Sequence, residues 1–266
     1  MTARILHVSD LHLGGDETLD PAPALRELAT DLAPELVLAT GDLGHRGRQS
    51  ELVRAAELLG SLGAPVLAVP GNHDIPYTVP ARFTHPFTAW ERVFGRIDPV
   101  HRSEMLIVVG LNSVRPWRQQ GGALSDTEMS RMASELARAP EGALRVVALH
   151  HHLAAPPWRA AHKRPLRRRN AVLQAFVEAG AELVAAGHVH QAAIAEHREF
   201  EALEDGRRGS LVLATAPGFG RPRPRRKGEA RGVNVYEAEA DVLTVTTHAW
   251  DGSTFAVSGR RTFQRL

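Results

Sequence analysis

The sequence of 266 residues contains no cysteine. Disulfide bonds and thiolate metal sites are therefore excluded, and any metal ion must be held by oxygen and imidazole ligands. Long hydrophobic runs are also lacking, because none approaches the ~18–20 apolar residues that a membrane-spanning helix needs. Residues 1–4 lead directly into a strand-like segment, without the apolar core of a signal peptide. We therefore expect a soluble, cytoplasmic protein with no membrane partner.

What is present is the composition of a globular protein, with 43% hydrophobic and 23% charged residues. The length suits one large α/β domain over residues 1–266, although two small domains would also fit. The formal net charge is only +2, yet basic residues gather in two runs. Residues 163–169 hold five of them, and residues 221–231 hold six against one Glu. Such runs are usually solvated loops, and the alternative is recognition of an anionic ligand.

Buried strands and amphipathic helices alternate through most of the chain. Apolar runs predict strands at 4–8, 36–40, 64–69, 105–111, 144–149 and 182–186. Apolar spacing and capping residues predict helices at 21–33, 50–62, 81–94, 125–139 and 166–179. This alternation is typical of a parallel α/β sheet, in which ligands bind at the carboxyl ends of the strands.

The pattern changes after residue 190. Five strands with no helix between them are predicted at 192–200, 210–216, 232–238, 242–249 and 254–259. We interpret residues 1–190 as a βα part that carries the motifs. Residues 191–266 are interpreted as a β-rich meander that completes the second sheet of a two-sheet sandwich within the same domain.

Polar residues of metal-ligand type follow several of the predicted strands. They occur as Asp10-x-His12, Gly41-Asp42, Gly71-Asn72-His73-Asp74, His150 and Gly187-His188-Val189-His190. Carboxylate, amide oxygen and imidazole groups suit hard or borderline divalent cations. The set is too large for one ion, and it suits two ions that share a carboxylate.

In this order the motifs D-x-H, G-D, G-N-H-D, H and G-H-x-H resemble those of the calcineurin-like metallophosphoesterases, over about residues 5–190. The details resemble the branch that includes cyclic-nucleotide and glycerophosphodiester phosphodiesterases. The H-H-P-P of many relatives is missing, because His150-His151-His152 stands in its place. The resemblance implies a four-layer α-β-β-α sandwich of two packed mixed β-sheets, with the metal site at the carboxyl ends of the strands.

The resemblance also implies a role for each motif residue. The first metal would be held by Asp10, His12, Asp42 and His190. The second would be held by Asp42, Asn72, His150 and His188, with Asp42 bridging the two ions. His73 would act as the catalytic imidazole, and Asp74 would hold its other ring nitrogen.

For other residues the sequence leaves alternatives open. His150 is favoured over His151 as the ligand by its position in the motif, and His151 would then face substrate or solvate its loop. His45 either contacts substrate or is an exposed loop histidine. Arg221 and Arg223 either bind an anionic substrate through their guanidinium groups or lie in an exposed linker.

The implied function is that of a metal-dependent phosphoric ester hydrolase. It would cleave a cyclic nucleotide or a similar small phosphodiester by attack of a metal-bridging hydroxide. Two divalent ions are expected, with Mn first and Fe, Zn, Co or Ni as alternatives. Alternatives in the same chemistry are a nuclease with DNA or RNA as partner, a phosphomonoesterase and a pyrophosphatase. The non-enzymatic alternative is a metal-binding protein-interaction scaffold, whose sequence mark would be a lost ligand or a lost His73.

Overall fold

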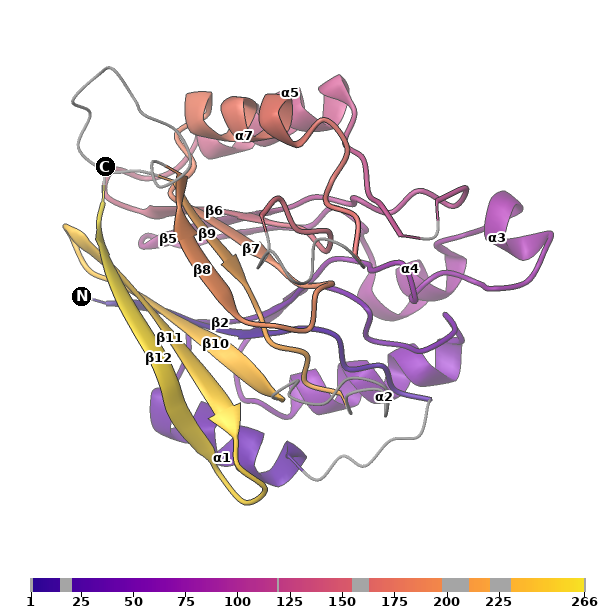
Figure 1. The fold of residues 1–266 in the computed structure, drawn as a ribbon, viewed down its shortest axis with the longest axis horizontal. Coiled ribbons are helices and arrows are strands. Elements are labelled where there is room, and N and C mark those ends of the chain that lie inside the picture. Colours follow the sequence, from indigo (N-terminus) through magenta and orange to yellow (C-terminus); the bar gives the residue numbers. More distant parts are fainter. Residues whose placement is uncertain are drawn as a thin grey trace.

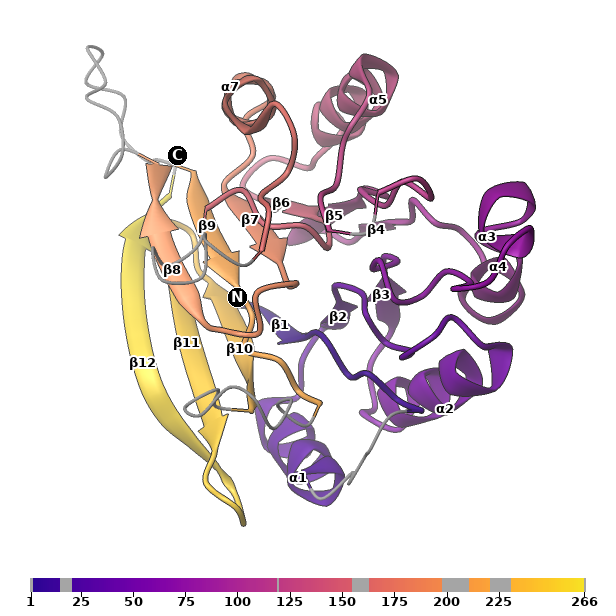
Figure 2. The ribbon, with the colours of Figure 1, turned by 45° about the vertical axis from the view of Figure 1, so that its right-hand side comes forward.

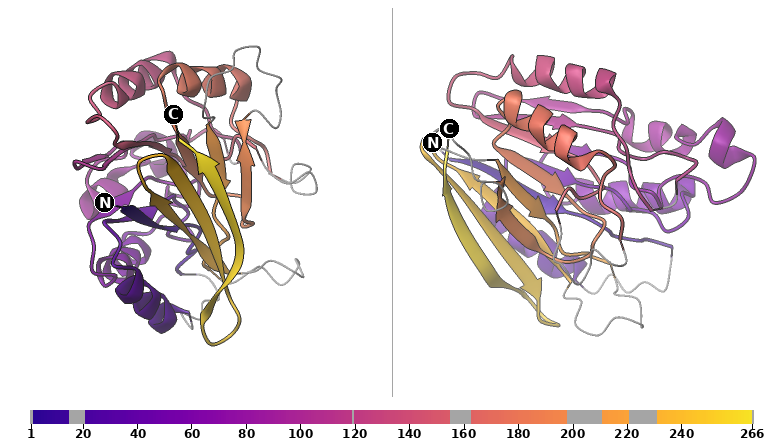
Figure 3. Two further views of the ribbon diagram at one scale, coloured as in Figure 1. Left: turned by 90° about the vertical axis from the view of Figure 1, so that its left-hand side faces the viewer. Right: turned by 45° about the horizontal axis from the view of Figure 1, so that its top comes forward.

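The computed structural model describes residues 2–14, 21–118, 120–154, 163–197, 211–220 and 231–265. Two six-stranded sheets pack face to face, and helices cover the outer face of each sheet (Figure 1; Figure 3). The α-β-β-α sandwich with two mixed sheets, predicted from the sequence, is confirmed.

Both sheets combine parallel and antiparallel strands. The first has the order β12-β11-β10-β1-β2-β3, and the second has the order β4-β5-β6-β7-β9-β8. The strands are β1 (Ala3–Val8), β2 (Leu36–Ala39), β3 (Val66–Ala68), β4 (Val100–Arg102), β5 (Leu106–Gly110), β6 (Leu144–Ala148), β7 (Leu183–Ala186), β8 (Ala193–Glu196), β9 (Val212–Thr215), β10 (Gly232–Ala238), β11 (Val242–Trp250) and β12 (Phe255–Gln264). Strands β1, β2 and β3 are parallel, as are β5, β6, β7 and β9.

Apolar side chains between these layers form three clusters. The helices are α1 (Ala22–Leu32), α2 (Gln49–Gly60), α3 (Ala81–Thr84), α4 (Thr88–Phe94), α5 (Asp126–Leu136) and α7 (Arg169–Glu178). One cluster lies between the sheets, a second packs the first sheet against α1, α2 and α4, and a third packs the second sheet against α5 and α7. Among the described residues, no helix combines the length and apolar character required to cross a bilayer.

Strand β1 illustrates why the sequence produces this layering. Its side chains alternate between the faces of the sheet, so Ile5 joins the cluster between the sheets while Leu6 joins the cluster under the helices. Both faces are buried, which explains why the strand reads as a continuous apolar run. Figure 2 shows β1, β2 and β3 side by side, with α1 and α2 beneath them. Their parallel pairing brings three carboxyl ends to one edge.

Two predictions about the elements are wrong in part. Residues 191–266 do not complete only the second sheet, because β8 and β9 join it beside β7 whereas β10, β11 and β12 extend the first sheet beside β1. The helix predicted over 81–94 is two helices, α3 and α4. Pro86 lies between them, and proline disfavours helical backbone at the preceding residue and lacks an N–H to donate.

His7 in β1 is fully buried between two hydroxyl groups. Its Nδ1 lies 2.6 Å from the Tyr236 hydroxyl, and its Nε2 lies 2.7 Å from the Thr40 hydroxyl. Burial lowers the pKa of His7 to about 3, although the charge of Asp10 opposes the shift. The neutral ring therefore links β1 to both of its neighbouring strands.

This burial predicts a pH-dependent stability. Between pH 6.5 and pH 3 the unfolded chain binds a proton at His7 and the folded chain does not, so stability falls as the pH is lowered. From pH 6.5 to pH 5 the loss is about 2 kcal/mol. Urea unfolding at pH 7 and pH 5 in the presence of a chelator should show a loss of stability on acidification that is about 2 kcal/mol larger in the wild type than in His7→Gln. Equal losses in the two proteins would contradict the assignment.

Candidate metal centre

Polar side chains from five strand ends meet at one edge of the sandwich. They are Asp10 and His12 after β1, Asp42 after β2, Asn72 after β3, His150 after β6, and His188 and His190 after β7. Backbone hydrogen bonds fasten the first two of these loops together, since the Asp10 N–H donates to the Gly41 carbonyl and the His12 N–H to the Asp42 carbonyl, both at 2.9 Å. The meeting point is the edge that the sequence predicts.

The backbone at this edge takes an unusual conformation. Five of the predicted ligands have φ between 50° and 71°, in the left-handed region: Asp10, His12, Asp42, His188 and His190. This conformation costs a side-chain-bearing residue roughly 1–2 kcal/mol. Among the other described non-glycine residues only Ala33 and Arg168 share it. Such strain gathers at functional sites, where the surrounding structure holds it in place.

Glycine allows the loops to approach one another closely. A Cβ atom on Gly71 would collide with the backbone nitrogen and Oδ1 of Asp42. A Cβ atom on Gly187 would collide with Ser9 Oγ and would lie 2.7 Å from Asp10 Oδ2. The glycines of G-N-H-D and G-H-x-H are therefore needed because Asp42 and the Ser9-Asp10 pair occupy the space beside them.

Asp10, His12, Asp42 and His190 form a first group, whose ligand-type atoms all lie within 4.8 Å of one another. The two ring nitrogens His12 Nε2 and His190 Nε2 are 3.2 Å apart. His190 Nε2 is also 3.1 Å from Asp10 Oδ1, and His12 Nε2 is 3.8 Å from Asp42 Oδ2. These four residues are the set expected from the sequence for a first ion.

A second group centres on His150. Its Nε2 lies 3.2 Å from Asn72 Oδ1, 3.1 Å from His188 Nδ1 and 3.4 Å from Asp42 Oδ1. Its Nδ1 donates to the Thr40 carbonyl at 2.7 Å, which leaves the lone pair of a neutral ring on Nε2. Asp42 thus directs Oδ2 toward the first group and Oδ1 toward the second, as a bridging carboxylate would.

The spacing within both groups fits divalent cations. Two imidazole nitrogens bound to one ion at ~2.1 Å, with an angle between ~90° and ~109°, lie about 3.0–3.4 Å apart. The observed pairs at 3.2 Å and 3.1 Å fall in that range. In the described structure, Asp10 Oδ1 and Asp42 Oδ2 are buried without an aligned hydrogen-bond donor. Their lone pairs are therefore available to a cation.

Charges among these groups support the same conclusion. Burial by itself would raise the pKa of both carboxyls, but the charges of His190 and His150 hold the pKa of Asp10 below its usual value, and those of His150 and His73 do so for Asp42. Burial lowers the pKa of His12 and His188 well below the usual value, which keeps their rings neutral. Ionised carboxylates and neutral imidazoles are the forms that bind metal. His150 differs from His12 and His188, because the charges of Asp42 and Asp10 raise its pKa to about 9 against its burial, so it must release a proton when a cation binds.

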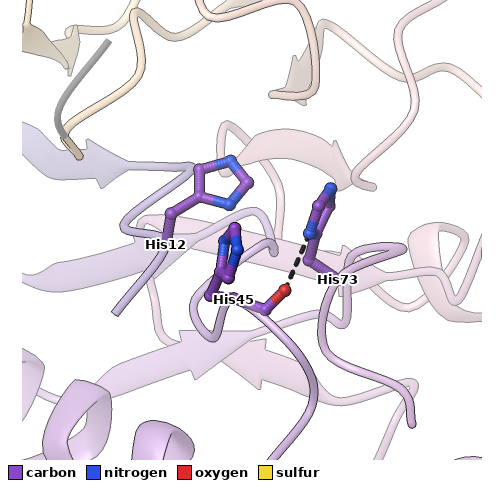
Figure 4. A group of neighbouring side chains, drawn as sticks. All are labelled: His12, His45 and His73. Atoms are coloured by element: carbon purple, nitrogen blue, oxygen red, sulfur yellow. Dashed lines mark hydrogen bonds between the residues drawn. The ribbon is translucent and has the colours of Figure 1, made fainter. Parts of the chain in front are cut away.

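His73 lies beside the first group and faces two other histidines (Figure 4). Its Nδ1 donates to the carbonyl oxygen of His45 at 2.9 Å, and the Tyr77 hydroxyl lies 2.7 Å from the same nitrogen. The rings of His12 and His73 meet edge to face at 4.8 Å between centroids, and the His45 ring lies 5.7 Å from the His73 ring. With Nδ1 engaged, Nε2 is the nitrogen of His73 that remains for a reacting group.

The expected role of Asp74 as the partner of His73 is wrong. Its carboxylate accepts the backbone N–H of Gly44 at 2.7 Å and that of Gly71 at 2.8 Å. Burial and the charge of Asp42 raise the pKa of Asp74 to about 8, against these two hydrogen bonds. Asp74 therefore joins the loop after β2 to the loop after β3, and a backbone carbonyl orients His73 in its place.

Of the remaining predicted site residues, the structure describes His151 and His45 but not the two arginines. His151 is buried, and its Nδ1 lies 2.8 Å from the Ser113 hydroxyl, with its ring 4.8 Å from that of His188. His151 is therefore part of the inner wall and not a solvated loop residue. His45 is half-buried and lies beside His73. Arg221 and Arg223 lie outside the described residues.

Two contacts of the centre could not be predicted from the sequence. Tyr77 reaches His73, although nothing in its loop sequence indicates a functional role. Ser9 Oγ donates to Asp10 Oδ2 at 2.7 Å and so occupies the carboxylate oxygen that faces away from the first group. A serine before an aspartate is too common a pair to predict such a contact.

Comparison with known proteins assigns a family to this geometry. The family profile described as calcineurin-like phosphoesterase matches residues 3–192. The chain belongs to the calcineurin-like phosphoesterase family. The resemblance seen in the five motifs is thereby confirmed.

Relatives and solved structures agree with this assignment. A probable cyclic nucleotide phosphodiesterase of Synechococcus sp. is 30% identical over 47% of this chain and 50% of its own length. The 3′,5′-cyclic adenosine monophosphate phosphodiesterase CpdA of Haemophilus influenzae is 26% identical over 75% of this chain and 74% of its own. A purple acid phosphatase from yellow lupin shares the fold, with a TM-score of 0.74 at 12% identity, over all of this chain and 54% of the phosphatase.

The crowding at Gly71 predicts a test of the centre. Gly71→Ala should destabilise the protein by about 2 kcal/mol or more, because only backbone movement relieves the collision with Asp42. It should also weaken metal binding, since Asp42 lies between the two groups. Gly60→Ala is the matched control, because no atom lies within 4 Å of its added Cβ. Equal free energies of unfolding and equal metal affinities for the two variants would refute this account.

Proposed function

We propose that the protein is a dinuclear, metal-dependent phosphodiesterase that acts on a cyclic nucleotide or a similar small diester. The observation that carries the proposal is the placement of Asp42, whose two carboxylate oxygens face two different ligand groups. In each group, two imidazole nitrogens lie at the distance expected for binding to one ion. In this proposal Asp10, His12, Asp42 and His190 hold one ion, and Asp42, Asn72, His150 and His188 hold the other. Mn is the metal we would load first.

The protein groups have separate tasks in the proposed reaction. Divalent ions at such a site lower the pKa of water and neutralise charge on phosphoryl oxygens. His73 is proposed to protonate the leaving oxygen or to stabilise charge on it through Nε2, because Nδ1 is bonded to the His45 carbonyl. The Tyr77 hydroxyl, near both ring nitrogens at 2.7 and 3.4 Å, restrains the ring plane.

The choice of a diester rests on the relatives and on the motif details. The relatives named above are called cyclic nucleotide phosphodiesterases. We propose His45 and His151 as substrate contacts, because their rings adjoin His73 and His188 respectively. Arg221 and Arg223 are proposed as further contacts on the basis of sequence alone.

The function is tested by comparing two chromogenic esters. Purified protein loaded with Mn should hydrolyse bis(p-nitrophenyl) phosphate much faster than p-nitrophenyl phosphate at low salt. Such a preference would justify trials of cyclic nucleotides and glycerophosphodiesters. A preference for the monoester would replace the diester proposal with a phosphomonoesterase. Failure to hydrolyse either ester, with both ions bound, would favour the scaffold alternative.

A second prediction concerns His73. His73→Ala should lower kcat on bis(p-nitrophenyl) phosphate by about 10²–10⁴-fold, the usual contribution of a proton-transferring side chain. Its metal content should remain that of the wild type, because the ring belongs to neither ligand group of the proposal. The variant His85→Ala, at an exposed histidine, serves as the control. Unchanged kcat, or loss of metal, would remove the assigned role.

A further inference from the structure

A second hollow lies outside the metal centre, next to the amino end of α7. Its volume is about 680 Å³, and its lining includes Gly122 and the arginines Arg118, Arg164, Arg167, Arg168 and Arg169. No aspartate or glutamate is among the described residues that line it. A concave surface with one sign of charge raises the local concentration of the opposite ion.

The arginines of this hollow are poorly neutralised by the protein itself. Arg168 forms an ion pair with Asp126 at 3.3 Å, but both side chains are exposed, so the pair contributes little. Within the described ranges, no carboxylate lies at ion-pair distance from the other four guanidinium groups. Like charges held around one hollow repel each other, and a multiply charged anion would relieve that repulsion.

The hollow shares a wall with the metal centre. Gly122 touches His151, because a Cβ on Gly122 would lie 2.5 Å from His151 Nδ1. The Leu166 N–H donates to the His152 carbonyl at 2.9 Å, and the Arg167 N–H donates to the Gly122 carbonyl at 3.0 Å. The charge of Arg169 helps to lower the pKa of His152, after burial and the charges of His150 and Lys163.

Only one imidazole separates the hollow from the second ligand group. The ring of His151 lies 5.0 Å from that of His150 and 4.8 Å from that of His188, between centroids. Its other contacts are Gly122 and Ser113. The Gly122 wall of the hollow therefore lies one side chain away from the second ligand group.

We propose that the arginine-lined hollow binds a second phosphate group of the substrate, apart from the diester that is cleaved. The inference rests on the proposed function and narrows its substrate class to phosphodiesters that carry a further phosphate. Guanidinium groups suit this ligand because their N–H donors form paired hydrogen bonds with phosphate oxygens. A diester with no second phosphate, such as bis(p-nitrophenyl) phosphate, leaves the hollow unused.

The test compares thymidine dinucleotides with and without a terminal phosphate at either the 5′ or the 3′ end. Mn-loaded wild type should prefer one of the phosphorylated forms by about tenfold or more in kcat/KM, as expected for charge-assisted hydrogen bonds. The double variant Arg164→Ala/Arg167→Ala should lose this preference and keep the wild-type rate on bis(p-nitrophenyl) phosphate. Arg138→Ala, at an exposed arginine of the loop after α5, should change neither rate.

Two results would overturn the proposal. One is a wild type that cleaves the plain and the phosphorylated dinucleotides equally well. The other is a double variant that loses activity on bis(p-nitrophenyl) phosphate and on the phosphorylated dinucleotide by the same factor, since the arginines would then act on the metal centre or the fold.

Binding to the metal-free protein separates this proposal from the proposed function. Calorimetry with inorganic pyrophosphate should show binding to the wild type that the double variant loses and Arg138→Ala keeps. If the wild type cleaves no diester and still binds pyrophosphate through these arginines, the phosphodiesterase proposal fails while the anion-binding hollow stands. Equal pyrophosphate binding by wild type and double variant would refute the hollow as an anion site.

Discussion

Two carboxylates buried at the edge of a two-sheet sandwich impose the main constraint on this fold. An unpaired charge in a protein interior is costly, so Asp10 and Asp42 require compensating groups on every side. The surrounding imidazoles, the close approach of glycine loops and the left-handed backbone at five candidate ligand positions all bring such groups into range. The large apolar clusters on either side of each sheet stabilise the fold and offset the strain at this edge.

Charges of opposite sign lie in two neighbouring places of this protein. A net charge of +2 conceals acidic groups held at the centre and arginines around the adjacent hollow. Asp74 is buried beside the acidic groups, but burial and the charge of Asp42 raise its pKa to about 8, so it adds little negative charge at neutral pH. The resulting field favours cations at the centre and anions at the hollow.

Much of the centre could be predicted because each ligand motif is local. Where a strand ends in Asp-x-His or Gly-Asp, its candidate ligands can be recognised from the local sequence alone. The role of Asp74 could not be predicted, because its partner Gly44 comes from another loop and is a backbone group with no sequence signature. The division of the last five strands between two sheets could not be predicted either. Alternating side chains specify which face of a strand is buried, but not which strand lies beside it.

That division of strands has a consequence for synthesis of the chain. Strand β1, which leads into Asp10 and His12, is hydrogen-bonded to β10, and β7, which leads into His188 and His190, is hydrogen-bonded to β9. Both partners follow every candidate ligand in the sequence, so a growing chain already contains all of these residues before one neighbour of β1 and one neighbour of β7 exist. Until residue 238 has been made, β1 therefore lies at an open edge of its sheet, and the loop that carries Asp10 and His12 follows an edge strand.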